Sequence, residues 1–111
     1  FSSCHSLISI TIPDSITSID KSIFRDCRSL TSISIPDSVT NIGDYFLSAC
    51  SSLSSIHVRW SNPSEVDLSS EEVFDGIRED AKLYVPIASL SQYQSSEQWT
   101  KYFSPEKIIG E

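Results

Sequence analysis

The chain has 111 residues, with 8 Lys and Arg against 15 Asp and Glu, and a formal net charge of −7. This length is typical of a single domain, and the apolar runs fall far short of the roughly 20 residues that a membrane-spanning helix needs. The acidic balance argues against nucleic acid as a partner, because neutralising phosphates takes clustered Lys and Arg.

A repeat of 23 residues organises the first half of the chain. Cys4, Cys27 and Cys50 lie at this spacing, and residues 1–23 and 24–46 are identical at 12 of 23 positions. A third copy begins at Leu47 and keeps the register as far as Val58. A fixed period of this size is typical of solenoids, in which each unit buries its apolar residues only by stacking on the next.

Each repeat predicts a strand, a turn and a return segment. The spacing Leu30-x-x-Ile33-x-Ile35 favours a short strand with one buried face, and the Pro36-Asp37-Ser38 that follows favours a turn. Val39, Ile42 and Phe46 then bring back apolar groups every three or four residues, which predicts a helical or 3₁₀ turn facing inward. Stacked repeats would place the Ile residues in columns that form the core.

The motif L-x-x-I-x-I-P-D-S-[IV]-T-x-I, followed by F-x-x-C-x-S-L, resembles the 23-residue leucine-rich repeats of BspA-like bacterial surface proteins, with Ile largely replacing Leu. The resemblance covers residues 1 to about 58, and residues 81–86 and 93–111 are similar to the terminal strand and closing helical segment of that family. It implies an α/β solenoid, a short right-handed superhelix with parallel β-strands on its concave face and a C-terminal helical cap.

The spacing changes after the third strand. Val58 and Val85 are 27 residues apart rather than 23, which predicts an insertion of four. We therefore expect leucine-rich repeats in residues 1–58, a degenerate repeat with an insertion in residues 59–86, and a cap in residues 87–111. Short helices there are expected to start at three capping boxes: Ser69-x-x-Glu72, Ser89-x-x-Gln92 and Ser95-x-x-Gln98. Aromatic residues are expected to close the open end of the stack: Tyr93, Trp99, Tyr102 and Phe103.

The residues between the buried Ile positions are expected to form two polar columns on the strands, Ser9, Ser32, Ser55, Lys82 and Thr11, Ser34, His57, Tyr84, flanked by Arg59 and Trp60. Aromatic residues and Arg are frequent binding anchors, so this pattern predicts a recognition surface centred on His57, Arg59, Trp60 and Tyr84, with Ser32, Ser34, Ser55 and Lys82 beside them. In the alternative interpretation the hydroxyls only suit a solvated strand surface, and Trp60 packs against the insertion.

Other reactive residues favour structural roles. The three cysteines are expected to be buried thiols acting as small hydrophobes, although neighbours in the stack could approach disulfide range. A zinc site would need paired Cys or His ligands, which the sequence lacks. The acidic stretch from Glu65 to Asp80 favours a solvated helix surface, with a weak divalent-ion site or a patch for a basic partner as alternatives.

The sequence lacks the motifs of common enzyme classes, and its two imidazoles, His5 and His57, have no nucleophile motif around them. We therefore expect no catalytic residues, no metal site and no cofactor. The residues predict a non-enzymatic interaction module without a membrane span, and the family resemblance implies an adhesion-like protein partner, such as a host or extracellular matrix protein, at the cell surface or in a secreted form. The main alternative is a structural spacer that displays another domain. Because the chain starts at Phe1, we expect it to be a segment of a longer exported protein, with any signal upstream.

Overall fold

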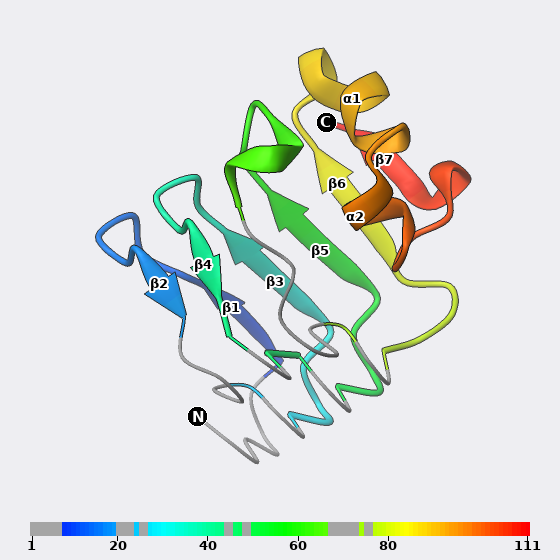
Figure 1. Cartoon of the computed structure of the whole chain (residues 1–111). Helices are drawn as coiled ribbons and strands as arrows, with labels where there is room; N and C mark the ends of the chain where they lie inside the picture. The colour runs from blue at the N-terminus through cyan, green and yellow to red at the C-terminus, as the bar shows by residue number, and fades with distance from the viewer. Residues whose placement is uncertain are drawn as a thin grey trace.

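Five parallel strands form the main sheet of the protein. The computed structural model describes residues 8–19, 24, 27–43, 46–47, 50–66, 74 and 77–111. Within these residues the strand order is β1-β3-β5-β6-β7, as Figure 1 shows. The strands are β1 (Ser9–Thr11), β3 (Ser32–Ile35), β5 (Ser55–Val58), β6 (Lys82–Val85) and β7 (Ile108–Gly110). The sequence-based prediction of parallel strands is confirmed, whereas β7 was not predicted.

The pairing register follows the repeat. One column runs through Ser9, Ser32, Ser55 and Lys82, and the other through Thr11, Ser34, His57 and Tyr84. These are the two columns that the sequence predicts, with an offset of 23 residues between the first strands and of 27 between β5 and β6. The four extra residues therefore leave the strand register unchanged.

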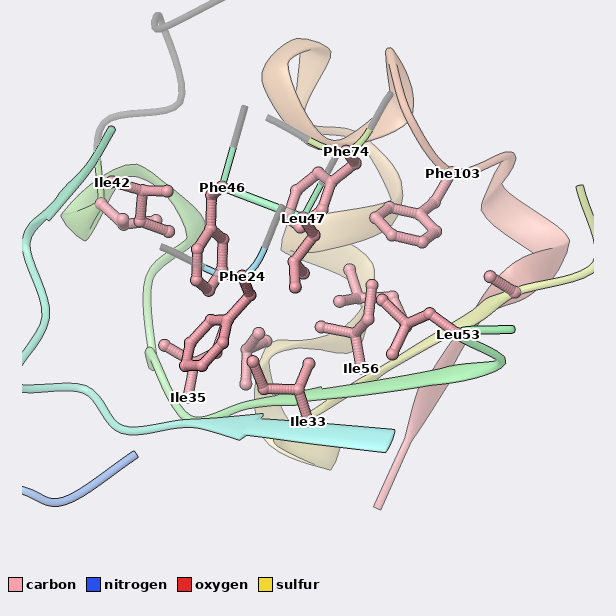
Figure 2. Packing of buried hydrophobic residues seen from close by; sticks show 14 of the residues in the cluster. Phe24, Ile33, Ile35, Ile42, Phe46, Leu47, Leu53, Ile56, Phe74 and Phe103 are labelled. Carbon is pink, nitrogen blue, oxygen red and sulfur yellow. The ribbon is translucent and has the colours of Figure 1, made fainter. Parts of the chain in front are cut away.

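The two columns lie on one face of the sheet, and the other face carries the hydrophobic core. Ile33, Ile35, Ile56, Leu83 and Val85 are each 0% exposed, and burying one such side chain contributes about 1.5–3 kcal/mol. Figure 2 shows the aromatic side chains of Phe24, Phe46, Phe74 and Phe103 on the side of the sheet that carries Ile33, Ile35 and Ile56. Phe24 and Phe46 form one ring pair, with centroids 5.7 Å apart. The predicted Ile columns therefore form the side of the core that lies against the sheet.

The segment after each turn is extended rather than helical. Asn41–Ile42 forms β4, which pairs in parallel with β2 (Ser18–Ile19) in a second, two-stranded sheet. The backbone amides of Thr40 and Gly43 donate to the carbonyls of Thr17 and Ile19. The prediction of a helical turn is wrong for these residues, because an extended segment satisfies its backbone groups by pairing with the preceding repeat. The prediction that Val39, Ile42 and Phe46 are buried is confirmed.

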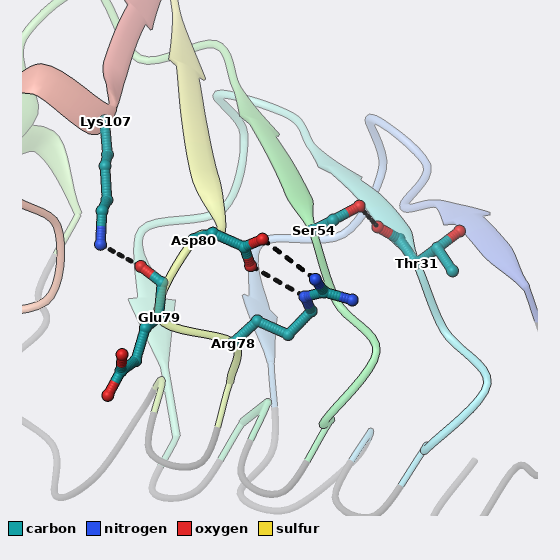
Figure 3. A network of polar contacts seen from close by, with 6 residues as sticks. All are labelled: Thr31, Ser54, Arg78, Glu79, Asp80 and Lys107. Carbon is teal, nitrogen blue, oxygen red and sulfur yellow. Dashed lines mark hydrogen bonds and ion pairs between the residues drawn. The ribbon is translucent and has the colours of Figure 1, made fainter.

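Hydroxyl side chains also link neighbouring repeats. Thr31 Oγ1 donates to the carbonyl of Ile8 at 3.2 Å, and Ser54 Oγ donates to the carbonyl of Thr31 at 3.3 Å; the second bond appears in Figure 3. On the other side of the unit, Ser38 Oγ donates to the carbonyl of Ile16 at 2.7 Å. Part of the high Ser and Thr content therefore serves contacts between successive units.

Short helical elements separate the strands in the second half. They are η1 (Pro63–Glu65), η2 (Ile87–Ser89), α1 (Leu90–Gln94), α2 (Glu97–Thr100) and η3 (Pro105–Lys107). Tyr93 and Trp99 are buried with ring centroids 5.5 Å apart, and Trp99 lies 6.0 Å from Phe74. None of the helices in the described part of the chain has the length and apolar character needed to cross a membrane.

Helices start at or one residue after two of the predicted capping boxes, but the capping hydrogen bonds predicted there are wrong; the third box, Ser69-x-x-Glu72, lies outside the described residues. The hydroxyl of Ser89 donates to the carbonyl of Ser61 at 2.6 Å instead of capping α1. The Gln98 amide donates to the carbonyls of Pro63 and Val66, both at 2.9 Å, and Ser96 rather than Ser95 precedes α2. Both side chains donate to carbonyls in the loop at residues 61–66, and the carbonyl of Pro63 also accepts a hydrogen bond of 3.0 Å from the indole N–H of Trp99. Such bonds compensate carbonyls that the helices cover.

Polar contacts involve the segment just before β6, residues 78–80, as Figure 3 shows. Arg78 and Asp80 form two parallel hydrogen bonds of 2.8 and 3.0 Å. Mainly through this bonding, Arg78 holds the pKa of Asp80 below its ordinary value, and Asp80 raises the pKa of Arg78. Lys107 Nζ donates to the backbone carbonyl of Glu79. Glu79 and Asp80 are exposed, as predicted, but they lie in a turn rather than on the predicted helix.

Candidate binding surface

The sheet presents a polar face on the side opposite the core. Because successive strand residues point to opposite sides, this polar strand face is formed by Ser9, Thr11, Ser32, Ser34, Ser55, His57, Lys82 and Tyr84, with Arg59 directly after β5. Lys82 and Arg59 are exposed, and Ser32, Ser34, Ser55, His57 and Tyr84 are half-buried. The structure therefore brings together seven of the eight residues predicted for binding.

The eighth predicted residue, Trp60, belongs to the core. It is 0% exposed, its indole N–H donates to the carbonyl of Val39 at 2.7 Å, and its ring lies 5.9 Å from that of Trp99. The prediction that Trp60 lies on the recognition surface is wrong. The alternation along β5 explains the result, since Ile56, Val58 and Trp60 share one parity and face the core, whereas His57 and Arg59 face the other way.

His57 and Tyr84 form a stacked pair across β5 and β6. Their ring centroids are 4.7 Å apart and their planes differ by 12°. The two residues are register partners, and directly opposed side chains in neighbouring strands are close enough for such contacts. The imidazole of His57 therefore lies nearly parallel to the phenol ring of Tyr84.

Glu111 completes the surroundings of His57. Its carboxylate lies with Oε2 2.8 Å and Oε1 3.3 Å from Nδ1 of His57. Its backbone amide donates to the carbonyl of Val85 at 2.9 Å, which extends the pairing of β7 with β6 by one residue. The side chains of His57 and Glu111 are 32% and 48% exposed, so this pair contributes at most about 1 kcal/mol. Sequence reasoning missed Glu111. The only sequence signal for its position is the short β-branched run Ile108-Ile109 before it, which favours a strand.

These groups surround a hollow at the carboxyl ends of the strands. Its volume is about 420 Å³, and its lining is Ser34, His57, Val58, Arg59, Pro86 and Glu111. Its lining residues carry a guanidinium, an imidazole, a carboxylate and a hydroxyl group. Such a mixture of a few polar groups around a concave surface is suited to recognition of a polar ligand.

Two cations of the polar strand face, Arg59 and Lys82, have no acidic partner among the residues that the structure describes. In the described residues, an ion pair joins Arg78 to Asp80 and Glu111 lies within hydrogen-bonding distance of His57, and no such contact involves Arg59 or Lys82. The carboxylates of Asp14 and Asp37, in the turns that follow β1 and β3, form no ion pair with Arg59 either. Arg59 and Lys82 are therefore available for an external ligand.

Residues 1–96 match the family model described as "BspA type Leucine rich repeat region (6 copies)". The chain belongs to this family of BspA-type leucine-rich repeats. The resemblance recognised from the repeat motif is thereby confirmed, and the match continues past Val58, where the 23-residue spacing ends. Neither the curated proteins nor the solved structures gave a match.

In this BspA-type repeat chain, the Cys of the repeat is a core residue. Cys27 and Cys50 are both 0% exposed, and the Cys50 thiol donates to the carbonyl of Phe24 at 3.0 Å. The burial predicted for these two residues is confirmed, whereas Cys4 and His5 lie outside the described residues. Within the part of the chain that the structure describes, no group of three or more His, Cys, Asp or Glu side chains is arranged to hold a metal ion.

Proposed function

We propose that this BspA-type repeat chain is a protein-binding module that recognises its partner through the polar strand face. The observation that carries the proposal is the cluster at the carboxyl ends of the strands, where His57, Tyr84, Arg59 and Glu111 lie around or beside one open hollow. Arg and aromatic residues are frequent anchors of protein interfaces. The hydroxyl columns beside them offer hydrogen-bonding groups along an extended surface, which is how repeat proteins commonly bind.

We also infer that the whole chain is a short right-handed solenoid with a C-terminal helical cap. Parallel strands in one sheet need a crossover connection, and such connections are right-handed in nearly all proteins. The parallel register of β1, β3, β5 and β6 supports this architecture. The polar strand face would then be the concave surface, and the buried Tyr93, Trp99 and Phe103 would close the end of the core.

Binding, rather than catalysis, is the function that the surroundings of His57 favour. His57 has an acid partner in Glu111, and Ser34 lines the same hollow. A hydrolase of the Ser-His-acid type would need a hydrogen bond between serine and imidazole, and in the described residues the hydrogen bonds of His57 go to Glu111. We therefore propose a non-enzymatic module without a cofactor. Covalent labelling of Ser34 by a fluorophosphonate probe would contradict this part of the proposal.

The family assignment supports a location at the bacterial surface or in a secreted form, where the partner would be a host or extracellular matrix protein. The test is binding of the purified chain to immobilised matrix proteins, measured by biolayer interferometry. The variant His57→Ala/Tyr84→Ala removes the stacked pair, and Glu97→Gln changes an exposed residue of α2 and serves as control. We expect the double variant to lose binding and the control to retain it. Equal binding by all three proteins would refute recognition through this face.

A structural spacer is the second candidate, and the burial of Trp60 favours it. With Trp60 in the core, the surface has one aromatic anchor fewer than the sequence predicts. A spacer would bind no matrix protein, and substitutions on the polar strand face would leave its stability and any activity of a linked domain unchanged. The binding assay described above therefore separates the two candidates.

A further inference from the structure

The polar strand face differs in charge from the protein as a whole. The chain carries a formal net charge of −7, yet the charged strand-face residues Lys82 and Arg59 are cations. They are exposed and, in the described part of the chain, free of ion pairs. Among the described residues that line the hollow, Glu111 supplies one carboxylate, which lies within hydrogen-bonding distance of His57. With Arg59 and Lys82 against Glu111, the formal charge of this face is positive.

The contact between Glu111 and His57 indicates which chemistry the hollow accepts. Both carboxylate oxygens of Glu111 approach Nδ1 of His57, at 2.8 and 3.3 Å. Arg59 belongs to the same lining, and its guanidinium has the fork of N–H donors that matches a carboxylate. The protein thus places one of its own carboxylates at the imidazole and leaves the stronger carboxylate-binding group, Arg59, exposed.

The two cations lie near opposite ends of the β5–β6 pair. Lys82 is the register partner of Ser55 at the start of β5, whereas Arg59 follows four positions after Ser55. Four residues of strand span about 13 Å. In an extended peptide, residues i and i+4 lie on the same side with the same spacing, so two acidic side chains at these positions could meet both cations.

We propose that the partner contributes an extended acidic segment, whose carboxylates pair with Arg59 and Lys82 across the polar strand face. This inference rests on the proposed protein-binding function and names the chemistry of its partner. The hydroxyls of Ser32, Ser34 and Ser55 lie on the same face and supply hydrogen-bonding groups to the segment. The carboxylate of Glu111 lines the same hollow as Arg59 and opposes the approach of the partner's carboxylates by repulsion between like charges.

The test uses short synthetic peptides of equal length, followed by NMR titration of the ¹⁵N-labelled chain at low salt. One peptide carries two aspartates four positions apart, a second carries them three positions apart, and two controls carry asparagine or lysine instead. We expect the first peptide to bind most tightly and to shift the amide signals of residues 55–59 and 82–84. Added salt should weaken its binding, because exposed charges are screened.

Variants of the chain give the decisive comparison. Arg59→Gln and Lys82→Gln should each weaken binding of the first peptide by about two- to fivefold, the range expected for an exposed ion pair. Lys101→Gln removes the same charge from an exposed site after α2 and should leave the affinity unchanged. Glu111→Gln removes the repelling charge and should strengthen binding by about twofold or more.

The outcomes separate this inference from the proposed function. Preference for the lysine peptide, or equal losses in the Arg59, Lys82 and Lys101 variants, would overturn the acidic-segment inference. If a matrix protein binds in a manner that depends on His57 and Tyr84 but the aspartate peptide does not compete with it, the inference fails and the proposed function stands. If no matrix protein binds through this face, the proposed function fails.

Discussion

Replacing Trp60 by Phe tests whether this residue supports the core, as the structure indicates, or the recognition surface, as the sequence suggests. The indole of Trp60 is 0% exposed and donates to the carbonyl of Val39 at 2.7 Å. Its own carbonyl accepts a hydrogen bond of 2.6 Å from the hydroxyl of Tyr93. Trp60 therefore joins the return segment of the second repeat to the C-terminal helices through one side-chain and one backbone contact.

The expected cost follows from these contacts. Phe keeps most of the apolar ring but has no N–H donor, so the carbonyl of Val39 loses its side-chain partner, at a cost of about 1–3 kcal/mol. The smaller ring leaves unfilled volume, which adds about 1 kcal/mol. We expect Trp60→Phe to lower the free energy of unfolding by about 2–4 kcal/mol, a large share of the roughly 5–15 kcal/mol of a typical domain.

The measurement is urea unfolding followed by far-UV circular dichroism, with Tyr84→Phe as the matched control. Tyr84 is a half-buried aromatic residue of the polar strand face, and its hydroxyl has no hydrogen-bonding partner in the described residues. The control should change stability by less than about 0.5 kcal/mol. A change of that small size in Trp60→Phe, together with lost partner binding, would refute the assignment of Trp60 to the core.

Three further predictions concern the C-terminal residues. Burial, and secondarily the charge of Glu65, raises the pKa of Tyr93 above its ordinary value of 10.0. As pH rises, this phenol therefore ionises at a lower pH in the unfolded chain than in the folded one, and the free energy of unfolding should fall above about pH 10. The urea midpoint, measured between pH 9 and 11.5, should fall less steeply in Tyr93→Phe than in the parent chain. Gln98→Ala removes two hydrogen bonds to the loop at residues 61–66 and should cost about 1–3 kcal/mol, whereas the exposed Gln92→Ala should cost almost nothing in the same unfolding assay. Gly110→Ala would place a methyl group in overlap with Cδ1 of Ile87 and 3.1 Å from the backbone of that residue. This overpacking should lower the thermal midpoint by an amount equivalent to about 1–3 kcal/mol. Adding Ile87→Ala to the same chain should recover only part of the loss, because the new methyl group still lies close to the backbone of residue 87.

The repeat made the strand register predictable, because one period imposes one environment on each column. The equivalents Ile33 and Ile56 share the core, and Ser34 and His57 share the polar face. The same parity rule places Trp60 in the core, and the error arose from treating it as a continuation of the exposed Arg59. The extended form of β4 was harder to predict, since the three- or four-residue spacing of Val39, Ile42 and Phe46 fits an inward-facing helical turn equally well.

The contact between His57 and Glu111 had no equivalent signal, because it joins residues 54 positions apart that belong to different kinds of segment. His57 occupies a repeat column, whereas Glu111 follows β7, whose residue Ile109 pairs with Tyr84 at a spacing of 25 rather than 23 or 27. No periodic comparison aligns these positions. The chemistry at this end of the polar strand face is therefore set by the strand that returns after the helices as much as by the repeat. A chain with the same repeats but a different final strand would present His57 and Arg59 without the repelling carboxylate, and on the proposal above it would bind an acidic segment more tightly.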